Sequence, residues 1–237
     1  MEDSYIALDL ETTGLRPKYD KILEIGAVKV EGGEVTGTYE TFIDSGVGIP
    51  PRITELTGIT QAMVAGSPPL SEAVEGFLDF AGEGILLGHN ILFDYSFMKR
   101  NVLNLGGTFE RKGIDTLSIS RLCLPELPGR SLDKMAAYYG IPQEQHHRAL
   151  DDALTAARLY ERLKEEFAKI RPELFAAAPL VAKIKKEGPI TNSQKVYLRD
   201  LIKYHRIESN VEIETLTKNE ASRMIDNIIF QYGKMTR

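Results

Sequence analysis

Residues 4 to 14 read SYIALDLETTG, and this stretch decides the fold class. Large apolar side chains occupy every second position along it, which is the period of a β-strand. Leu8 and Leu10 therefore point to one face, while Asp9 and Glu11 point to the other. Side chains two residues apart on a strand leave the same face about 6–7 Å apart. The sequence thus predicts a strand that carries two carboxylates side by side and ends in a turn.

Two adjacent carboxylates on an otherwise apolar strand need a compensating cation if they are buried. Divalent magnesium and manganese prefer hard oxygen ligands, so a metal site is one interpretation of Asp9 and Glu11. The alternative is a strand edge that faces solvent and carries ordinary surface acids. The pair alone does not separate these two interpretations.

From residue 15 to residue 167, strand-like and helical patterns follow one another. Two β-rich runs flank a Gly-Gly hairpin turn, and a segment rich in Pro, Gly and Thr follows with short helical pieces. Apolar periodicity predicts further strands at 85–88 and 115–124, and helices at 71–80, 94–105, 131–139 and 149–167. Strands first, then alternating helices and strands, indicate an α/β fold with a mixed sheet flanked by helices.

The pattern changes after Pro172 and the FAAAPL segment at 175–180. Two helices are expected there, and both starts have the capping-box spacing that satisfies free helix amides: Thr191 with Gln194, and Thr217 with Glu220. We therefore expect three parts: a main domain at 1–170, a linker at 171–190 and a small helical C-terminal module at 191–237.

Composition is that of an ordinary globular protein, with 43% hydrophobic and 27% charged residues among 237. No apolar run is long enough to span a bilayer, and the acidic start does not resemble a signal peptide. We therefore expect no membrane partner. The lone Cys123 cannot form an internal disulfide, so nothing indicates an oxidising compartment and we expect a cytoplasmic protein. Residues 171–237 carry 12 basic and 8 acidic groups, whereas the rest carries 17 and 26. An acidic body with a basic tail suits a cation site beside a region that attracts phosphate.

Two other segments carry acidic and histidine side chains that could bind a metal or move a proton. Asp94 lies in GHNILFDYSFMKR (88–100), where an acid at a helix start would also complement the helix dipole. The segment HHRALDDALTAARLY (146–160) places two histidines and two aspartates at a helix start. Histidine is the side chain best suited to move a proton near neutral pH. The alternative is a polar helix start with capping acids.

Taken in order, the three segments form a recognisable set: D9-L-E11-T-T-G, then H89-N90-x-x-F93-D94-x-x-F97, then H147-R-A-x-x-D152-A. This set resembles the DEDDh branch of the DnaQ-like (RNase H-like) 3′→5′ exonuclease superfamily, which includes the epsilon proofreading subunit of bacterial DNA polymerase III. The resemblance covers residues 3–167, including LTGIT at 56–60. It implies an RNase H-like mixed five-stranded sheet flanked by helices, and it makes 1–170 the exonuclease domain.

The histidine and aspartate doublets allow two assignments. His146 with Asp151 and His147 with Asp152 have the same spacing of five. Only the second pair also places alanines where the family motif has small residues. We therefore assign His147 and Asp152 to the site.

The resemblance implies a role for each matched residue. It implies two divalent ions, Mg²⁺ or Mn²⁺, held by Asp9, Glu11, Asp94 and Asp152. It implies that His147 is the general base that takes a proton from the attacking water. Substrate-binding candidates near the acids are Thr12, Thr13 and Phe93, although Phe93 also fits as a core aromatic.

Four basic residues of the C-terminal module follow one another at helical spacing: Lys195, Arg199, Lys203 and Arg206. One interpretation is a ridge that tracks a phosphate backbone. The others are a solvated helix face and a docking surface for a DNA polymerase or another replication protein.

The expected function is therefore a metal-dependent 3′→5′ exonuclease that acts on single-stranded DNA 3′ ends and releases nucleoside 5′-monophosphates in proofreading or repair. One alternative is a 3′→5′ exoribonuclease of the same superfamily, because sugar discrimination depends on the pocket around the 2′-position. The other is a non-catalytic nucleic-acid-binding protein or polymerase adaptor.

Overall fold

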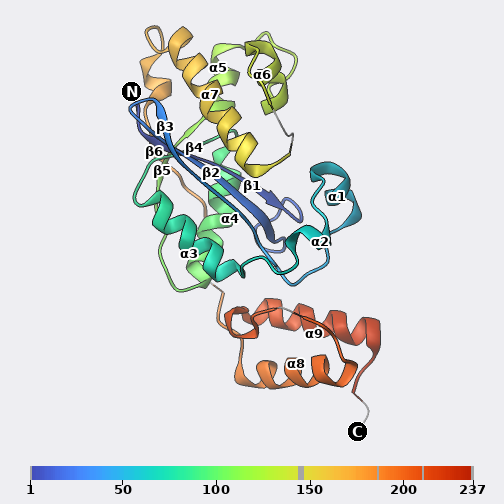
Figure 1. Cartoon of the computed structure of the whole chain (residues 1–237). Coiled ribbons are helices and arrows are strands. Elements are labelled where there is room, and N and C mark those ends of the chain that lie inside the picture. Colours follow the sequence, from blue (N-terminus) through green and yellow to red (C-terminus); the bar gives the residue numbers. More distant parts are fainter. Residues whose placement is uncertain (1, 144–146, 186, 210, 236–237) are drawn as a thin grey trace.

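The computed structural model describes residues 2–143, 147–185, 187–209 and 211–235. Its centre is a sheet with the strand order β3-β2-β1-β4-β5-β6 (Figure 1). The strands are β1 (Tyr5–Thr12), β2 (Ile22–Glu31), β3 (Glu34–Phe42), β4 (Leu86–Gly88), β5 (Lys112–Asp115) and β6 (Ala178–Pro179). Strand β1 is antiparallel to β2 and parallel to β4, so the sheet is mixed, as predicted.

The described sheet has six strands rather than the five expected. The additional strand is β6, which pairs antiparallel with β5 and lies inside the segment expected to be a linker. Just before it, the 3₁₀ turn η1 (Pro172–Phe175) places Phe175 in the core, fully buried 6.0 Å from the ring of Tyr160. Pro172 therefore starts a turn that belongs to the main domain's core. The sheet continues to Pro179, past the boundary at residue 170 that the composition change suggested. The three-part division of the chain otherwise stays a prediction.

The hairpin between β2 and β3 has the expected turn. Gly32 and Gly33 have φ values of 61° and 84°, which glycine adopts without steric strain. Positive φ at both central residues is the geometry that matches the twist of paired antiparallel strands. The turn therefore fixes the pairing register of β2 with β3.

Helices cover both faces of the sheet (Figure 1). One face packs on α3 (Leu70–Ala81) and α4 (Ile91–Asn104), and its core includes Leu8 and Leu10 of β1. The opposite face packs on α5 (Thr116–Cys123), α6 (Leu132–Tyr139) and α7 (Ala149–Phe167), and its core includes Ala7. Two short helices, α1 (Pro51–Thr57) and α2 (Gln61–Val64), follow β3. The alternation along β1 therefore separates two hydrophobic cores.

The strand predicted over 115–124 is wrong, because this segment forms helix α5. Asp115 caps the helix by accepting a hydrogen bond from the Leu117 N–H. The buried side chains Thr116, Ile119 and Ser120 have helical spacing. Alternating apolar and polar residues favour a strand, so the apolar pattern concealed the helix, whereas Asp115 supplies a helix cap.

The C-terminal helices α8 (Asn192–His205) and α9 (Lys218–Tyr232) both begin with the predicted capping boxes. A 3₁₀ turn, η2 (Ile213–Thr215), lies between them. The two helices pack through a small core around Leu198, Leu201 and Ile228. Among the described helices, none has the length and apolar character that a membrane crossing requires.

Candidate active site

Strand β1 supplies the first two acids of the site from the middle of the sheet. Asp9 and Glu11 lie on the face that carries Ala7, toward α7, and both are partly buried. The predicted placement of two carboxylates on one face of a strand is therefore confirmed, and this strand lies inside the sheet.

Asp94 comes to the same place from the opposite layer. It lies in the first turn of α4, is 3% exposed, and its Oδ1 accepts a hydrogen bond from the Leu10 N–H at 3.0 Å. This bond ties Asp94 to the backbone of β1 between the two strand acids. The acid at the helix start thus faces the strand instead of solvent.

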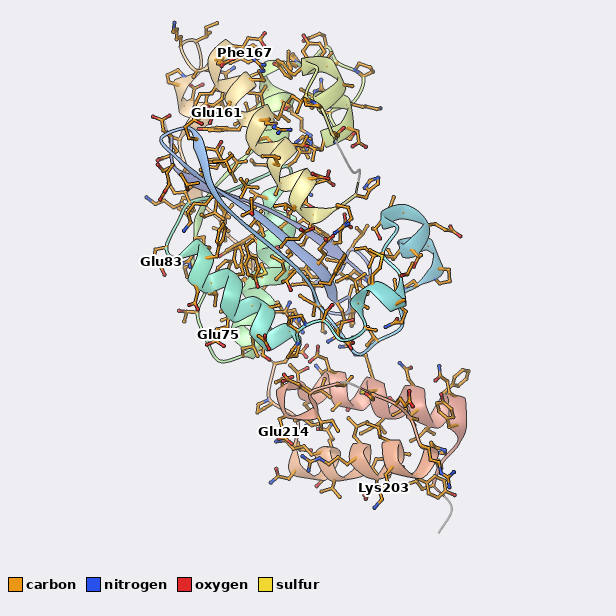
Figure 2. The ribbon with its side chains drawn as sticks, in the orientation of Figure 1. Glu75, Glu83, Glu161, Phe167, Lys203 and Glu214 are labelled. Carbon is orange, nitrogen blue, oxygen red and sulfur yellow. The ribbon has the colours of Figure 1, made fainter. Side chains whose placement is uncertain are left out.

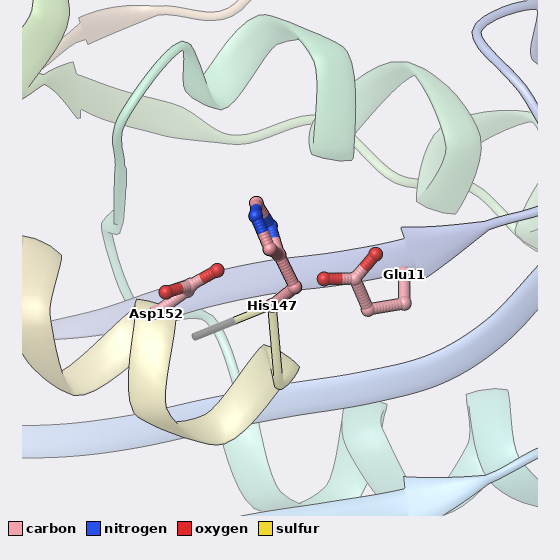
Figure 3. Close-up of side chains that lie close together, drawn as sticks. All are labelled: Glu11, His147 and Asp152. Atoms are coloured by element: carbon pink, nitrogen blue, oxygen red, sulfur yellow. The ribbon is translucent and has the colours of Figure 1, made fainter. Parts of the chain in front are cut away.

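Helix α7 supplies the remaining members. Ligand atoms of Glu11, His147 and Asp152 all lie within 4.8 Å of one another. Figure 3 shows the Glu11 carboxylate from β1 beside the His147 ring, which precedes α7, and Asp152 in the first turn of that helix. Residues more than 130 positions apart in sequence therefore form one cluster.

The structure bears on one of the two possible histidine–aspartate pairs. Asp152 is in the cluster with Glu11, as the motif assignment requires. His146 lies outside the described residues. The assignment of His147 and Asp152 stays a prediction that this geometry favours.

Burial and mutual repulsion disfavour the charged forms of the strand acids and of Asp94. Burial raises the pKa of Asp9 well above its usual range, and the negative charges of Asp94 and Asp152 raise it further. Burial likewise raises the pKa of Glu11 to about 8, with further contributions from Asp152 and Glu24. Burial also raises the pKa of Asp94, against the opposing effect of its hydrogen bond from Leu10.

These raised pKa values have a direct consequence for metal binding. Carboxylates crowded in this way repel one another, and a divalent cation relieves the repulsion by replacing bound protons. The donor set is rich in carboxylate oxygens, which magnesium and manganese prefer. The residues present therefore fit the divalent ions that the motif implies.

A pocket of about 440 Å³ opens next to Glu11. Its volume falls within the range of about 300–1,000 Å³ that is usual for small-ligand sites. Thr12 and Phe93 line it, as do Leu15 and Leu56, which are 75% and 57% exposed. Sequence reasoning missed the two leucines as site residues, although Leu56 belongs to the LTGIT stretch.

The three predicted substrate-binding residues have different surroundings. The Thr12 hydroxyl donates to the Gly14 carbonyl at 2.7 Å, and the Thr13 hydroxyl accepts from the Lys21 N–H at 2.9 Å. Both hydroxyls therefore stabilise the turn after β1. Phe93 is partly buried against Phe97, with ring centroids 5.0 Å apart, and it also lines the pocket. Phe93 is therefore both a core aromatic and a residue that lines the pocket.

The predicted basic ridge on α8 is divided by ion pairing. Lys195 and Arg199 both pair with Glu214 of η2. Lys203 and Arg206 are exposed, and Lys203 lies on the side of the helix pair away from the sheet (Figure 2). Half of the ridge is therefore partly neutralised within the module.

A mixed sheet of this strand order, with carboxylates from β1, α4 and α7 and a histidine beside them, defines a nuclease of the RNase H-like fold. The model of the Exonuclease family (RNase_T) matches residues 6–160. The chain therefore belongs to this exonuclease family, and the predicted resemblance to DnaQ-like exonucleases is confirmed.

Relatives come from bacterial DNA polymerase III. The chain is 43% identical over 173 residues to the DNA polymerase III PolC-type of Clostridium perfringens, covering 73% of this chain and 12% of that protein. It is 34% identical over 167 residues to the DNA polymerase III subunit epsilon of Aquifex aeolicus, covering 70% of this chain and 83% of that subunit. The chain thus spans about an eighth of the PolC-type relatives, and most of the epsilon subunit.

Solved structures confirm the fold. Escherichia coli exonuclease I in complex with a dT13 oligonucleotide aligns with a TM-score of 0.65 at 18% identity, over 73% of this chain and 43% of that one. Exonuclease X in complex with 5′ overhanging duplex DNA aligns with a TM-score of 0.57 at 23% identity, over 72% and 99%. The α/β class with an RNase H-like mixed sheet is therefore confirmed.

Proposed function

We propose that this protein is a 3′→5′ exonuclease that removes nucleotides from single-stranded DNA 3′ ends with the help of two divalent ions. The observation that carries the proposal is the meeting of Glu11, His147 and Asp152 within 4.8 Å, beside Asp9 and the strand-bound Asp94. A structural protein has no physical need for so many buried and partly buried carboxylates in one place.

The four acids would hold the ions: Asp9, Glu11, Asp94 and Asp152. When bound, Mg²⁺ or Mn²⁺ would neutralise the phosphate, lower the pKa of the attacking water and stabilise the leaving oxygen. The fixed positions of the acids on a central strand and two helix starts make this arrangement rigid. Rigid donors need little reorganisation during the reaction.

His147 would accept the proton of the attacking water. The water oxygen forms a bond to phosphorus while the bond between phosphorus and the 3′ oxygen of the preceding nucleotide breaks. The leaving 3′ oxygen takes a proton from solvent, so the products are a nucleoside 5′-monophosphate and a new 3′-hydroxyl. An imidazole suits this role because its usual pKa lies near neutral pH.

The pocket beside Glu11 would receive the 3′-terminal nucleotide. Phe93, Leu15 and Leu56 offer apolar surfaces for a base, next to the acids that act on its phosphate. Stacking of a base on an aromatic ring contributes about 1–3 kcal/mol and tolerates any sequence. The turn made by Thr12 and Thr13 would shape the pocket floor through its backbone.

The relatives support DNA over RNA as the substrate. Both the PolC-type and the epsilon relatives are DNA polymerase III proteins, and exonuclease I was solved with a DNA oligonucleotide. We therefore place the activity in proofreading or repair in the cytoplasm, with a DNA polymerase or another replication protein as the expected partner.

The test is a digestion of 3′-labelled and 5′-labelled single-stranded DNA and RNA, with Mn²⁺ and with EDTA. The proposal predicts metal-dependent stepwise shortening from the 3′ end and faster action on DNA. Faster action on RNA would instead identify an exoribonuclease. If folded protein degraded no strand, a non-catalytic nucleic-acid-binding role would replace the proposal.

A further inference from the structure

A fifth carboxylate, Glu24, lies beside the cluster without belonging to it. Glu24 is on β2, directly opposite Glu11 in the pairing of β1 with β2, and it is 0% exposed. A carboxylate removed from water in this way requires partners that replace its hydration. Its partners are therefore informative about its role.

Two neighbouring residues at the start of α7, Arg148 and Ala149, donate hydrogen bonds to Glu24. The Arg148 Nε donates to Oε1 at 3.0 Å, and the Arg148 Nη2 donates to the same oxygen at 2.8 Å. The Ala149 N–H donates to Oε2 at 3.2 Å. Ala149 is the first residue of α7, so this amide is one of those that lack a partner within the helix. Glu24 therefore caps α7 from a neighbouring strand.

The segment held in this way carries two of the three clustered side chains. His147 immediately precedes Arg148, and Asp152 lies in the first turn that Ala149 begins. His147 has a φ of 59°, a left-handed conformation that is uncommon for residues other than glycine. Such a conformation persists where the surrounding structure holds it in place.

A second contact fixes the same helix start on the same strand. A Cβ atom on Gly26 would lie 2.1 Å from the Ala149 carbonyl carbon and from the Leu150 nitrogen. The absence of a side chain on Gly26 therefore allows the first turn of α7 to touch β2. Gly26 sets the distance between α7 and the sheet, and Glu24 sets the position along the strand.

We propose that Glu24 is a positioning residue that fixes His147 and Asp152 opposite Glu11 by holding Arg148 and the first amide of α7. This inference rests on the proposed function and names a residue that acts through others. Residues that hold metal ligands in place without binding the metal commonly lower metal affinity or activity about 10–100-fold when they are replaced. We expect an effect of this size for Glu24.

The chain offers a matched control. Glu40 on β3 also accepts a hydrogen bond from the Arg148 Nη2, at 2.9 Å, and its side chain is 42% exposed. Among the described residues, its hydrogen bonds reach the Arg148 side chain but not the Ala149 amide, which donates to Glu24. Replacing Glu40 removes one carboxylate partner of Arg148 but leaves the cap on α7 in place.

The experiment compares Glu24→Ala, Glu24→Gln and Glu40→Gln with the wild type in the full chain. Mn²⁺ affinity is measured by electron paramagnetic resonance without nucleic acid, and kcat and KM are measured on a single-stranded DNA oligonucleotide. We expect Glu24→Ala to lose about 10–100-fold in both Mn²⁺ affinity and kcat, with little change in KM. In Glu24→Gln the amide oxygen can still accept from the Ala149 N–H, so its Mn²⁺ affinity and kcat should lie between those of Glu24→Ala and the wild type. Glu40→Gln should match the wild type in both quantities.

Wild-type Mn²⁺ affinity in folded Glu24→Ala would overturn the proposal, as would equal losses in Glu40→Gln. If Glu24→Ala does not fold, Glu24→Gln decides, and wild-type Mn²⁺ affinity and kcat in that variant would overturn it. If the wild type degrades no nucleic acid but Mn²⁺ affinity follows the expected order, the proposed function fails and the positioning role of Glu24 stands.

Discussion

The crowded acids predict an unusual pH dependence of stability in the metal-free protein, which Glu11→Gln should reduce. Burial and the charges of Asp152 and Glu24 raise the pKa of Glu11 from 4.5 to about 8. Below about pH 4.5 this group is protonated in both the folded and the unfolded chain. Above that pH the unfolded chain releases the proton, while the folded chain retains it until about pH 8.

The size of the effect follows from this difference in proton binding. Where the folded state holds one more proton, the free energy of unfolding falls by about 1.4 kcal/mol per pH unit. Between about pH 5 and pH 7, Glu11 alone accounts for a loss on the order of 3 kcal/mol. In a chain of this size, that corresponds to a melting temperature lower by about 6–12 °C.

The assay is thermal unfolding in EDTA, followed by circular dichroism at several pH values, for the wild type and Glu11→Gln. The wild type should lose stability relative to the variant as pH rises from about 5 to 7, and saturating Mn²⁺ should remove this loss because the ion replaces the proton. A difference between wild type and variant that stays constant with pH would refute the explanation of the raised pKa.

Three further outcomes follow from the site and the module. His147→Ala should lower kcat about 10²–10⁴-fold with an unchanged circular dichroism spectrum; wild-type turnover would exclude it as the base. Gly26→Ala should force the first turn of α7 away from the sheet and destabilise the fold by about 1–3 kcal/mol, measured by urea unfolding. Lys203→Ala and Arg206→Ala should each reduce the salt dependence of single-strand binding by about 0.7 in the log–log slope, measured by fluorescence anisotropy. Lys195→Ala should change this salt dependence less, because Lys195 already pairs with Glu214.

Local pattern was sufficient to predict the elements that carry the site. The alternation around Asp9 predicted β1, and the periodicity after His147 predicted α7 with the bounds Ala149–Phe167. The order of the motifs brought Asp94 to the same site, and the structure places its carboxylate on the backbone of β1. These features are encoded within a few residues of each acid.

Other features depend on contacts between distant segments, and local pattern did not reveal them. Strand β6 has two residues and is defined by its pairing with β5, a strand distant in sequence. Glu24 lies within an ordinary β-rich run, and its partners are 124 and 125 positions away in sequence. The division of the basic ridge similarly depends on Glu214, which no helical spacing connects to Lys195.

In the proposed function, the cluster of Glu11, His147 and Asp152 hydrolyses the 3′-terminal phosphodiester of DNA. The most direct test compares Asp152→Asn with Asp151→Asn in single-turnover digestion of a 5′-labelled single-stranded oligonucleotide with Mn²⁺. The two variants remove the same charge from adjacent positions on α7, but only Asp152 lies in the cluster. We predict that Asp152→Asn abolishes 3′-end shortening while Asp151→Asn stays within a few-fold of the wild type. Equal activity in the two variants, or loss only in Asp151→Asn, would contradict the claim.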